Sequence, residues 1–158
     1  MAVDLTPIDD GLLKEIPGYS CMSGTAANVQ KDGQLVERHD NANVESSIKK
    51  DKLGIDITVK FNIKNEKVYI PVIVTKSGLK DVIYNTFYID KNSSIDIIAG
   101  CGIHNDSHEG SIHEFILEKG SRVTYVEKHY DEGEGTDERT LNLMTKVSQA
   151  RTAFTRWA

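Results

Sequence analysis

The chain has 158 residues, of which 39% are hydrophobic, and its net charge at pH 7 is −5. This length allows one domain with a substantial core. The acidic balance, without a basic stripe interleaved with aromatic residues, argues against a nucleic-acid surface. No apolar run approaches the roughly 20 residues of a membrane-spanning helix, and the N-terminus lacks a signal-peptide pattern. We therefore expect a cytoplasmic protein that binds neither nucleic acid nor membrane.

Residues 1–53 are predicted to form an N-terminal helix followed by an irregular arm. Thr6 is a suitable cap, Pro7 suits the first helical position, and Pro17-Gly18 ends the helix. One helix face carries Ile8, Leu12 and Ile16. Tyr19–Asn43 is rich in Gly, Ser, Asn and Asp and has little periodicity, so we expect an irregular arm that leads into a sheet.

An internal repeat organises residues 54–142. Phe87–Ile98 aligns with Phe115–Val126 without a gap, at a constant offset of 115 − 87 = 28. Phe61–Ile70 repeats the pattern with one residue fewer in the turn. Each unit reads as a strand, a polar turn and a strand, and such units stack because none buries its apolar face alone. The sequence therefore predicts an all-β fold, a β-helix of stacked rungs, over residues 54–142.

The segment Gly100-Cys101-Gly102 is the first candidate site. Its glycines free the backbone to turn sharply and allow a partner to approach the cysteine sulfur closely. A thiolate there suits sulfur or iron chemistry, whereas the alternative is a small buried hydrophobe at a strand end. The other cysteine, Cys21, is interpreted as an incidental thiol, and a disulfide between the two is not expected in a cytosolic chain.

Five ionisable residues complete the candidate set. Glu127 and His129 continue the two-residue alternation of Val123 and Tyr125, which directs them towards the interior beside Cys101 or leaves them on an exposed strand end. The remaining candidates are weak metal ligands, because they flank a loop and no zinc-type motif supports them. They are His104, His108 and His113.

Three segments of the chain resemble the SufB/SufD family of iron–sulfur cluster assembly proteins. They are Ile98–Asn105, the Ile112-His113 step and Tyr125–Thr136, which reads Tyr-Val-Glu-Lys-His-Tyr and continues to Gly-Glu-Gly-Thr. The resemblance implies a right-handed parallel β-helix and a scaffold that is not itself an enzyme. It also implies transient binding of an iron–sulfur cluster, a SufC-type ATPase partner, and a SufB/SufD-type subunit or second copy. The role of sulfur acceptor falls on Cys101.

The resemblance fades at Leu141–Thr145. Family members continue with further rungs and a helical region that docks SufC, so the resemblance implies a short, truncated member in which SufC docking is an open question. Residues 143–158 form a divergent tail, with apolar residues at spacings of 4, 3, 4 and 3. This pattern predicts a helix that caps the open end of the stack, or else an unordered tail. The apolar residues are Leu143, Val147, Ala150, Phe154 and Trp157.

Two other function classes are compatible with the composition. A metal-dependent protein on a cupin-like β-barrel would use the histidines as ligands, although a His-x-His step is missing. A carbohydrate-active β-helix would need clustered acidic residues and aromatic platforms, which one Trp in the tail supports poorly.

Overall fold

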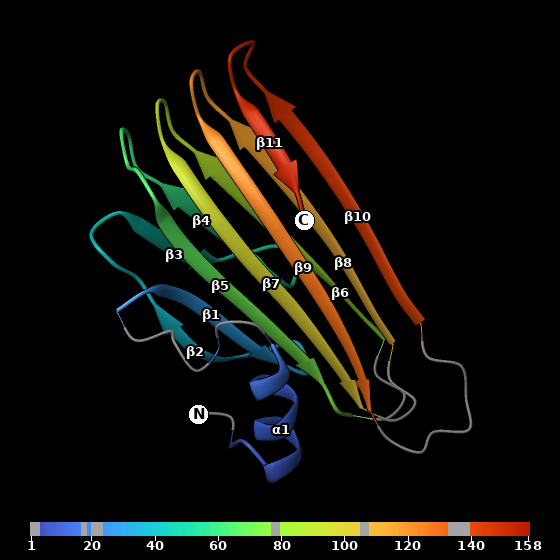
Figure 1. The fold of residues 1–158 in the computed structure, drawn as a ribbon. Helices are drawn as coiled ribbons and strands as arrows, with labels where there is room; N and C mark the ends of the chain where they lie inside the picture. Colours follow the sequence, from blue (N-terminus) through green and yellow to red (C-terminus); the bar gives the residue numbers. More distant parts are fainter. Residues whose placement is uncertain (1–3, 17–18, 20–23, 77–79, 105–107, 133–139) are drawn as a thin grey trace.

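The computed structural model describes residues 4–16, 19, 24–76, 80–104, 108–132 and 140–158. These residues are mostly β-structure, with a single short helix among them (Figure 1). The elements are α1 (Pro7–Glu15), β1 (Ala26–Lys31), β2 (Gln34–His39), β3 (Val44–Ile48), β4 (Ile55–Val59), β5 (Glu66–Val74), β6 (Lys80–Ile89), β7 (Ser94–His104), β8 (His108–Leu117), β9 (Arg122–Glu132), β10 (Thr140–Gln149) and β11 (Phe154–Trp157).

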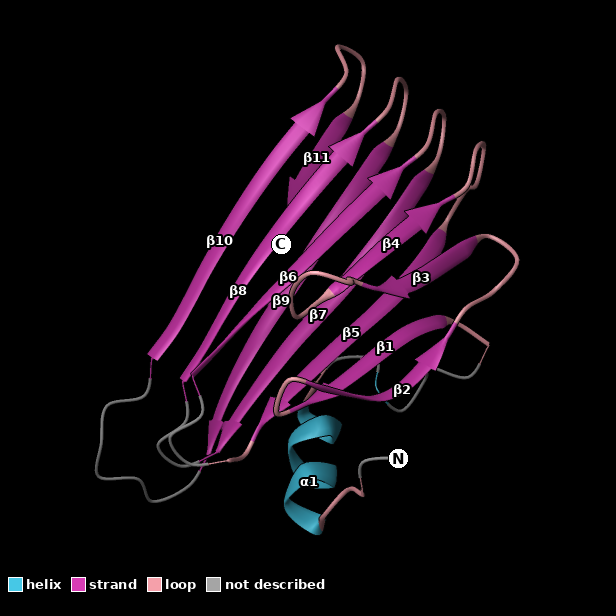
Figure 2. Ribbon diagram, turned by 180° about the vertical axis from the view of Figure 1, so that it is seen from behind, coloured by secondary structure: helices cyan, strands magenta, loops and turns pink. Residues whose placement is uncertain are grey.

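The strands form two sheets that face each other. One sheet has the order β11-β9-β7-β5-β1-β2, and the other has the order β10-β8-β6-β4-β3. From β4 onwards the chain changes sheet at every turn, and strands that neighbour each other within a sheet are parallel (Figure 2). The pairs β1–β2 and β3–β4 are antiparallel, so both sheets are mixed. Neither sheet closes on itself, so the described residues do not form the barrel that the cupin-like alternative requires.

Strand pairing confirms the 28-residue repeat. Phe87 lies beside Phe115 in one sheet, and Ile95 lies beside Val123 in the other. The alignment of Phe61 with Phe87 is wrong, because Ile57 is the residue that pairs with Phe87. Phe61 instead lies in a turn and is 57% exposed. The strand ends before it because the turn contains asparagines with positive φ, a conformation that Asn tolerates better than most residues.

The space between the sheets holds the main hydrophobic core. Phe87 and Phe115 stack with ring centroids 4.6 Å apart, and Tyr125 meets Phe115 edge-on at 5.2 Å. The Trp157 ring is the next in this row, and its centroid lies 5.3 Å from that of Tyr125. Aromatic pairs at such separations add to the free energy of burial. The side chains of successive parallel strands therefore form columns that run across the sheets.

The predicted N-terminal helix is confirmed as α1. Thr6 and Asp9 form a capping box, and Asp9 pairs with Lys31 of β1 at 2.7 Å. The buried face of the helix differs slightly from the prediction. Leu13 is buried, whereas Ile8, which was expected on this face, is 47% exposed. The stripe of Leu12, Leu13 and Ile16 packs with Val29 and Ile73 on the outer face of the first sheet. Among the described residues, no helix is long and apolar enough to cross a membrane.

The irregular arm predicted for Tyr19–Asn43 contains two strands, so that prediction is wrong for residues 26–39. Asp32 and Gly33 both have positive φ and form the two-residue turn of the β1–β2 hairpin. The Asp32 carboxylate accepts hydrogen bonds from the backbone N–H groups of Thr75 and Lys76 at 2.8 and 3.1 Å. The hairpin forms because β1 pairs in parallel with β5, a distant partner that local periodicity does not reveal.

The predicted C-terminal helix is also wrong. Thr140–Gln149 is strand β10, which pairs with β8, and Phe154–Trp157 is strand β11, which pairs with β9. Ala150 lies in the turn between them, where its carbonyl accepts from Ala153 N at 2.9 Å. The helical spacing of the apolar residues is therefore coincidental, because backbone pairing with the preceding strands decides the local structure.

Candidate functional site

Three of the predicted site residues line one small cavity between the two sheets. Cys101 comes from β7, Glu127 from β9 and His113 from the facing strand β8. The cavity volume is about 10 Å³, roughly enough for one water molecule. The other lining residues are Ile70, Val72, Ile83, Asn85, Ala99, Gly100 and Ser111.

Strand register explains why these residues meet. Cys101 is paired with His129, and Ala99 is paired with Glu127, on adjacent parallel strands. Alternation then places Glu127 on the side of the buried Tyr125, which is the first of the two orientations that the sequence allowed. The Glu127 Oε1 atom lies 3.7 Å from His113 Nε2 and 3.7 Å from His129 Nε2. These separations are too long for hydrogen bonds, so the carboxylate lies between two imidazoles without bonding directly to either.

Burial changes the pKa values of His113, His129 and Glu127 so that the neutral form of each is favoured. Burial, with a contribution from nearby His129, lowers the pKa of His113 to about 4. Burial also lowers the pKa of His129. The pKa of Glu127 is raised by burial, an effect that a hydrogen bond from Tyr125 opposes. At neutral pH the His113 imidazole is therefore uncharged, and the lowered pKa of His129 also favours the neutral form of its imidazole.

Sequence reasoning missed two polar residues of the cavity, Asn85 and Ser111. The Asn85 Oδ1 atom accepts from Ile55 N at 3.3 Å, but its Nδ2 atom has no hydrogen-bond partner among the described residues. The buried Nδ1 atom of His113 also has none there. A signal for Asn85 was present, because the repeat offset places it beside His113. The cavity therefore has unused hydrogen-bonding capacity.

The glycines on either side of Cys101 have a different role from the one predicted. A Cβ atom on Gly100 would lie 2.5 Å from Ile16 Cγ2, and one on Gly102 would lie 3.1 Å from Leu12 Cβ. These glycines therefore allow α1 to pack on the outer face of β7. The Cys101 side chain points the other way and is only 4% exposed, so the interpretation of an open approach to its sulfur is wrong.

The three weak histidine candidates are not brought together as a set. His104 ends β7 and His113 lies within β8, on the opposite sheet, while the side chain of His108 lies outside the described structure. Within the described part of the chain, no group of three or more His, Cys, Asp or Glu side chains is arranged to hold a metal ion. Cys101 is a buried cysteine, and Cys21 lies outside the described residues.

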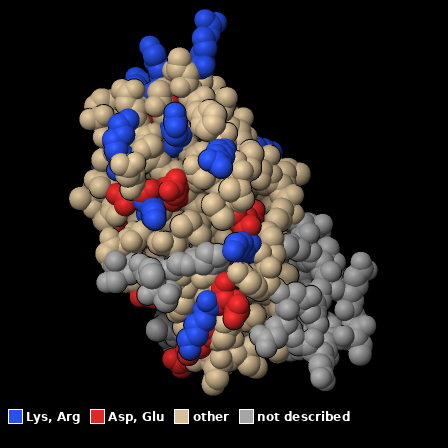
Figure 3. Space-filling view, in the orientation of Figure 1, with Lys and Arg blue, Asp and Glu red and all other residues tan. Residues whose placement is uncertain are grey.

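Charged side chains on the surface are of mixed sign. On the face seen in Figure 3, Lys and Arg are interspersed with Asp and Glu and separated by uncharged residues. A continuous field of one sign that would attract a polyelectrolyte is not visible in the described part of this face. The candidate site is therefore defined by the buried side chains of the cavity, and not by a charged surface.

Comparison with known proteins gives no match. No family model matches the chain, and neither the curated proteins nor the solved structures include one that does. The resemblance to the SufB/SufD family thus depends on the residues quoted above.

Proposed function

We propose that this chain is a scaffold component of a SUF-type iron–sulfur cluster assembly system, with Cys101 as the sulfur acceptor. One observation carries the proposal: Cys101 is paired in register with His129 and shares a cavity with Glu127 and His113. Thiolate, imidazole and carboxylate are all ligands of iron in proteins. In this proposal the chain is not an enzyme. Iron and sulfur are delivered to it in the cytoplasm, and a cluster is held transiently.

The sulfur-accepting step uses Cys101 and His129, its in-register neighbour on β9. The Cys101 thiol loses its proton to a neutral imidazole. We assign this role to His129, which is paired in register with Cys101. The resulting thiolate attacks the outer sulfur of a donor persulfide, the donor leaves as a thiolate, and Cys101 becomes the persulfide. Because Cys101 is only 4% exposed, both the approach of a donor persulfide and the building of a cluster require the lining side chains to move apart. The cavity of about 10 Å³ has room for roughly one added atom.

The finer fold belongs to the same proposal. We infer a right-handed parallel β-helix, because the chain alternates between two facing sheets and every second strand from β4 onwards pairs in parallel with the one before it in the same sheet. Stacked rungs of this kind place residues 28 apart beside each other, as Cys101 and His129 are. The proposed partners are a SufC-type ATPase and a SufB/SufD-type subunit or a second copy of this chain.

The proposal is tested by anaerobic reconstitution with iron and a sulfide source. We expect visible cluster absorbance in the wild type, its loss in Cys101→Ala, and reduced absorbance in Glu127→Gln and His129→Gln. Cys21→Ala is the matched control for removal of a thiol and should retain the absorbance. Equal absorbance in Cys101→Ala, with the fold checked by circular dichroism, would remove Cys101 from the mechanism.

Partner binding is tested separately by a pull-down of a SufC-type ATPase with the full chain. Capture of the ATPase supports the assembly role. A failure to capture it contradicts the proposed partner, while leaving the reconstitution result to decide the role of Cys101.

A further inference from the structure

Strands β10 and β11 form one end of the two sheets, and core side chains reach solvent there (Figure 2). Leu143, Thr145 and Val147 of β10 continue the columns of buried side chains that β8 contributes to the core. Leu143 is nevertheless 40% exposed and Val147 is 39% exposed, since no described strand lies beyond them. Trp157 of β11, at the end of the aromatic row, is 48% exposed. This end of the core is therefore open.

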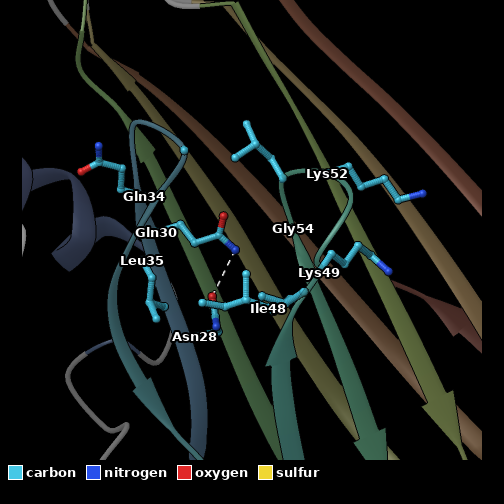
Figure 4. Close-up of a pocket in the computed structure, with 11 residues that line it drawn as sticks. Asn28, Gln30, Gln34, Leu35, Ile48, Lys49, Lys52 and Gly54 are labelled. Atoms are coloured by element: carbon cyan, nitrogen blue, oxygen red, sulfur yellow. Dashed lines mark hydrogen bonds between the residues drawn. The ribbon is translucent and has the colours of Figure 1, made fainter.

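The strands at the opposite end have features that discourage pairing with another chain. β2 ends in Glu37, Arg38 and His39, and its register with β1 shifts. β3 is only five residues long. Figure 4 shows that polar as well as aliphatic side chains line the groove between the two hairpins at this end. The polar ones include Gln34, Lys49 and Lys52. Charges, irregular register and short length are the means by which natural sheets protect their edges.

Strand β10, by contrast, is long, regular and almost uncharged. It pairs with β8 over ten consecutive residues without a register shift, and Lys146 is its only charged residue. Ala150 N, just after the strand, donates to Leu117 O of β8 at 2.9 Å. Because alternate residues of a strand direct their N–H and C=O groups to opposite sides, those of residues 143, 145 and 147 point away from β8. The edge therefore presents a row of backbone donors and acceptors beside apolar side chains.

We propose that β10 pairs with β10 of a second copy of this chain, antiparallel and about a two-fold axis at Thr145. In this register Leu143 lies opposite Val147 of the other copy, so apolar side chains meet on the core face. Lys146 lies opposite Met144, which keeps the two lysines apart. An axis at Lys146 would instead place the lysines directly opposite each other, which is unfavourable.

A two-fold pairing of this kind uses the same surface on both copies, so it closes as a dimer. Trp157 lies close to the pairing edge, because its ring centroid is 5.5 Å from that of Phe115, which is the register partner of Val147. The second copy is one of the partners named under the proposed function. The pairing itself uses no residue of the Cys101 cavity, so self-association and sulfur chemistry stand or fall separately.

The test is the molar mass of the 158-residue chain by sedimentation equilibrium across a wide range of concentration. We expect a monomer–dimer equilibrium, with a blue shift in the emission of Trp157, the single tryptophan, as the dimer forms. Thr145→Pro removes an N–H that points away from β8, so it should keep the fold by circular dichroism and lose the dimer. Thr145→Val keeps that N–H and the branched side chain, and as the matched control it should dimerise like the wild type.

Three outcomes would overturn the proposal. A monomer at every concentration would mean that the edge is left free or takes a different occupant, such as an extended peptide. Species larger than a dimer would mean unspecific edge aggregation, and undiminished dimerisation of Thr145→Pro would mean another interface. If Thr145→Pro does not fold, Thr145→Lys places two like charges opposite each other at the axis and must shift the equilibrium to monomer. Cys101→Ala should dimerise like the wild type whatever its cluster absorbance, which distinguishes failure here from failure of the assembly role.

Discussion

His113 shows how burial changes the chemistry of a single residue. Its side chain is 4% exposed, its ring centroid lies 5.5 Å from that of Tyr125, and its pKa is about 4. The unfolded chain therefore binds a proton at His113 more readily than the native chain, so stability falls as the pH drops from about 6.5 towards 4. Between pH 7 and pH 5 this contribution amounts to about 2 kcal/mol.

We expect His113→Phe to lose this part of the pH dependence. Phenylalanine cannot be protonated and is compatible with the stacked Phe87 and Phe115 nearby. The measurement is the free energy of unfolding by urea at pH 7 and pH 5 in both proteins. The difference between the two proteins reports the loss of the titrating group at His113. In the wild type, the lowered pKa of His129 adds to the loss of stability at low pH, and the raised pKa of Glu127 opposes it. An unchanged pH dependence in His113→Phe contradicts the assignment, and His39→Gln, an exposed position, is the control.

Element packing accounts for the Gly-Cys-Gly sequence. Helix α1 lies on the outer face of β7 directly behind the Cys101 cavity, and Gly100 is where Ile16 comes closest. We expect Gly100→Ala to destabilise the fold by about 1–3 kcal/mol, because its Cβ would overlap Ile16 Cγ2 and the helix would have to move. Urea unfolding measures this cost.

Two further variants make that expectation specific. Gly11→Ala, in α1 with nothing within 4 Å of the added Cβ, should be neutral or stabilising, because alanine is the better helix former. Gly100→Ala should cost less in an Ile16→Ala background, where the overlapping methyl groups are absent. An equal cost in both backgrounds would show that backbone freedom, and not helix packing, is the reason for Gly100.

The elements differ in how far local sequence determines them. The capping box of Thr6 and Asp9 and the 28-residue repeat depend on short, regular patterns, and the structure has both. The β1–β2 hairpin and β10 depend on pairing with strands far away in the chain, and local spacing was misleading for both. The meeting of Cys101 with Glu127 was one of the two orientations that strand alternation allowed, whereas the contribution of His113 required knowledge of how the facing sheet is placed.

At the scale of the whole molecule, support from neighbouring strands is uneven across the two sheets. Strands β7 and β9 each have a parallel neighbour on both sides. Strand β10 ends the order of its sheet among the described residues, and its apolar side chains are substantially exposed. They are Leu143, Met144 and Val147. Regions with exposed backbone hydrogen bonds and few buried apolar groups open first.

We therefore expect amide hydrogen exchange to be graded along the stack. Amides of β7 should exchange slowest, through global unfolding, and those of β10 and β11 should exchange faster, through local opening. Trp157→Ala should accelerate exchange in β11 further and leave β5 unchanged, because Trp157 packs against Phe115 and Tyr125 at the end of the aromatic row. The measurement is residue-resolved exchange by mass spectrometry or NMR at several protein concentrations. If the amides of β10 exchange as slowly as those of β7 at every concentration, the strands unfold as one cooperative unit. The expected gradient in exchange rates is then wrong.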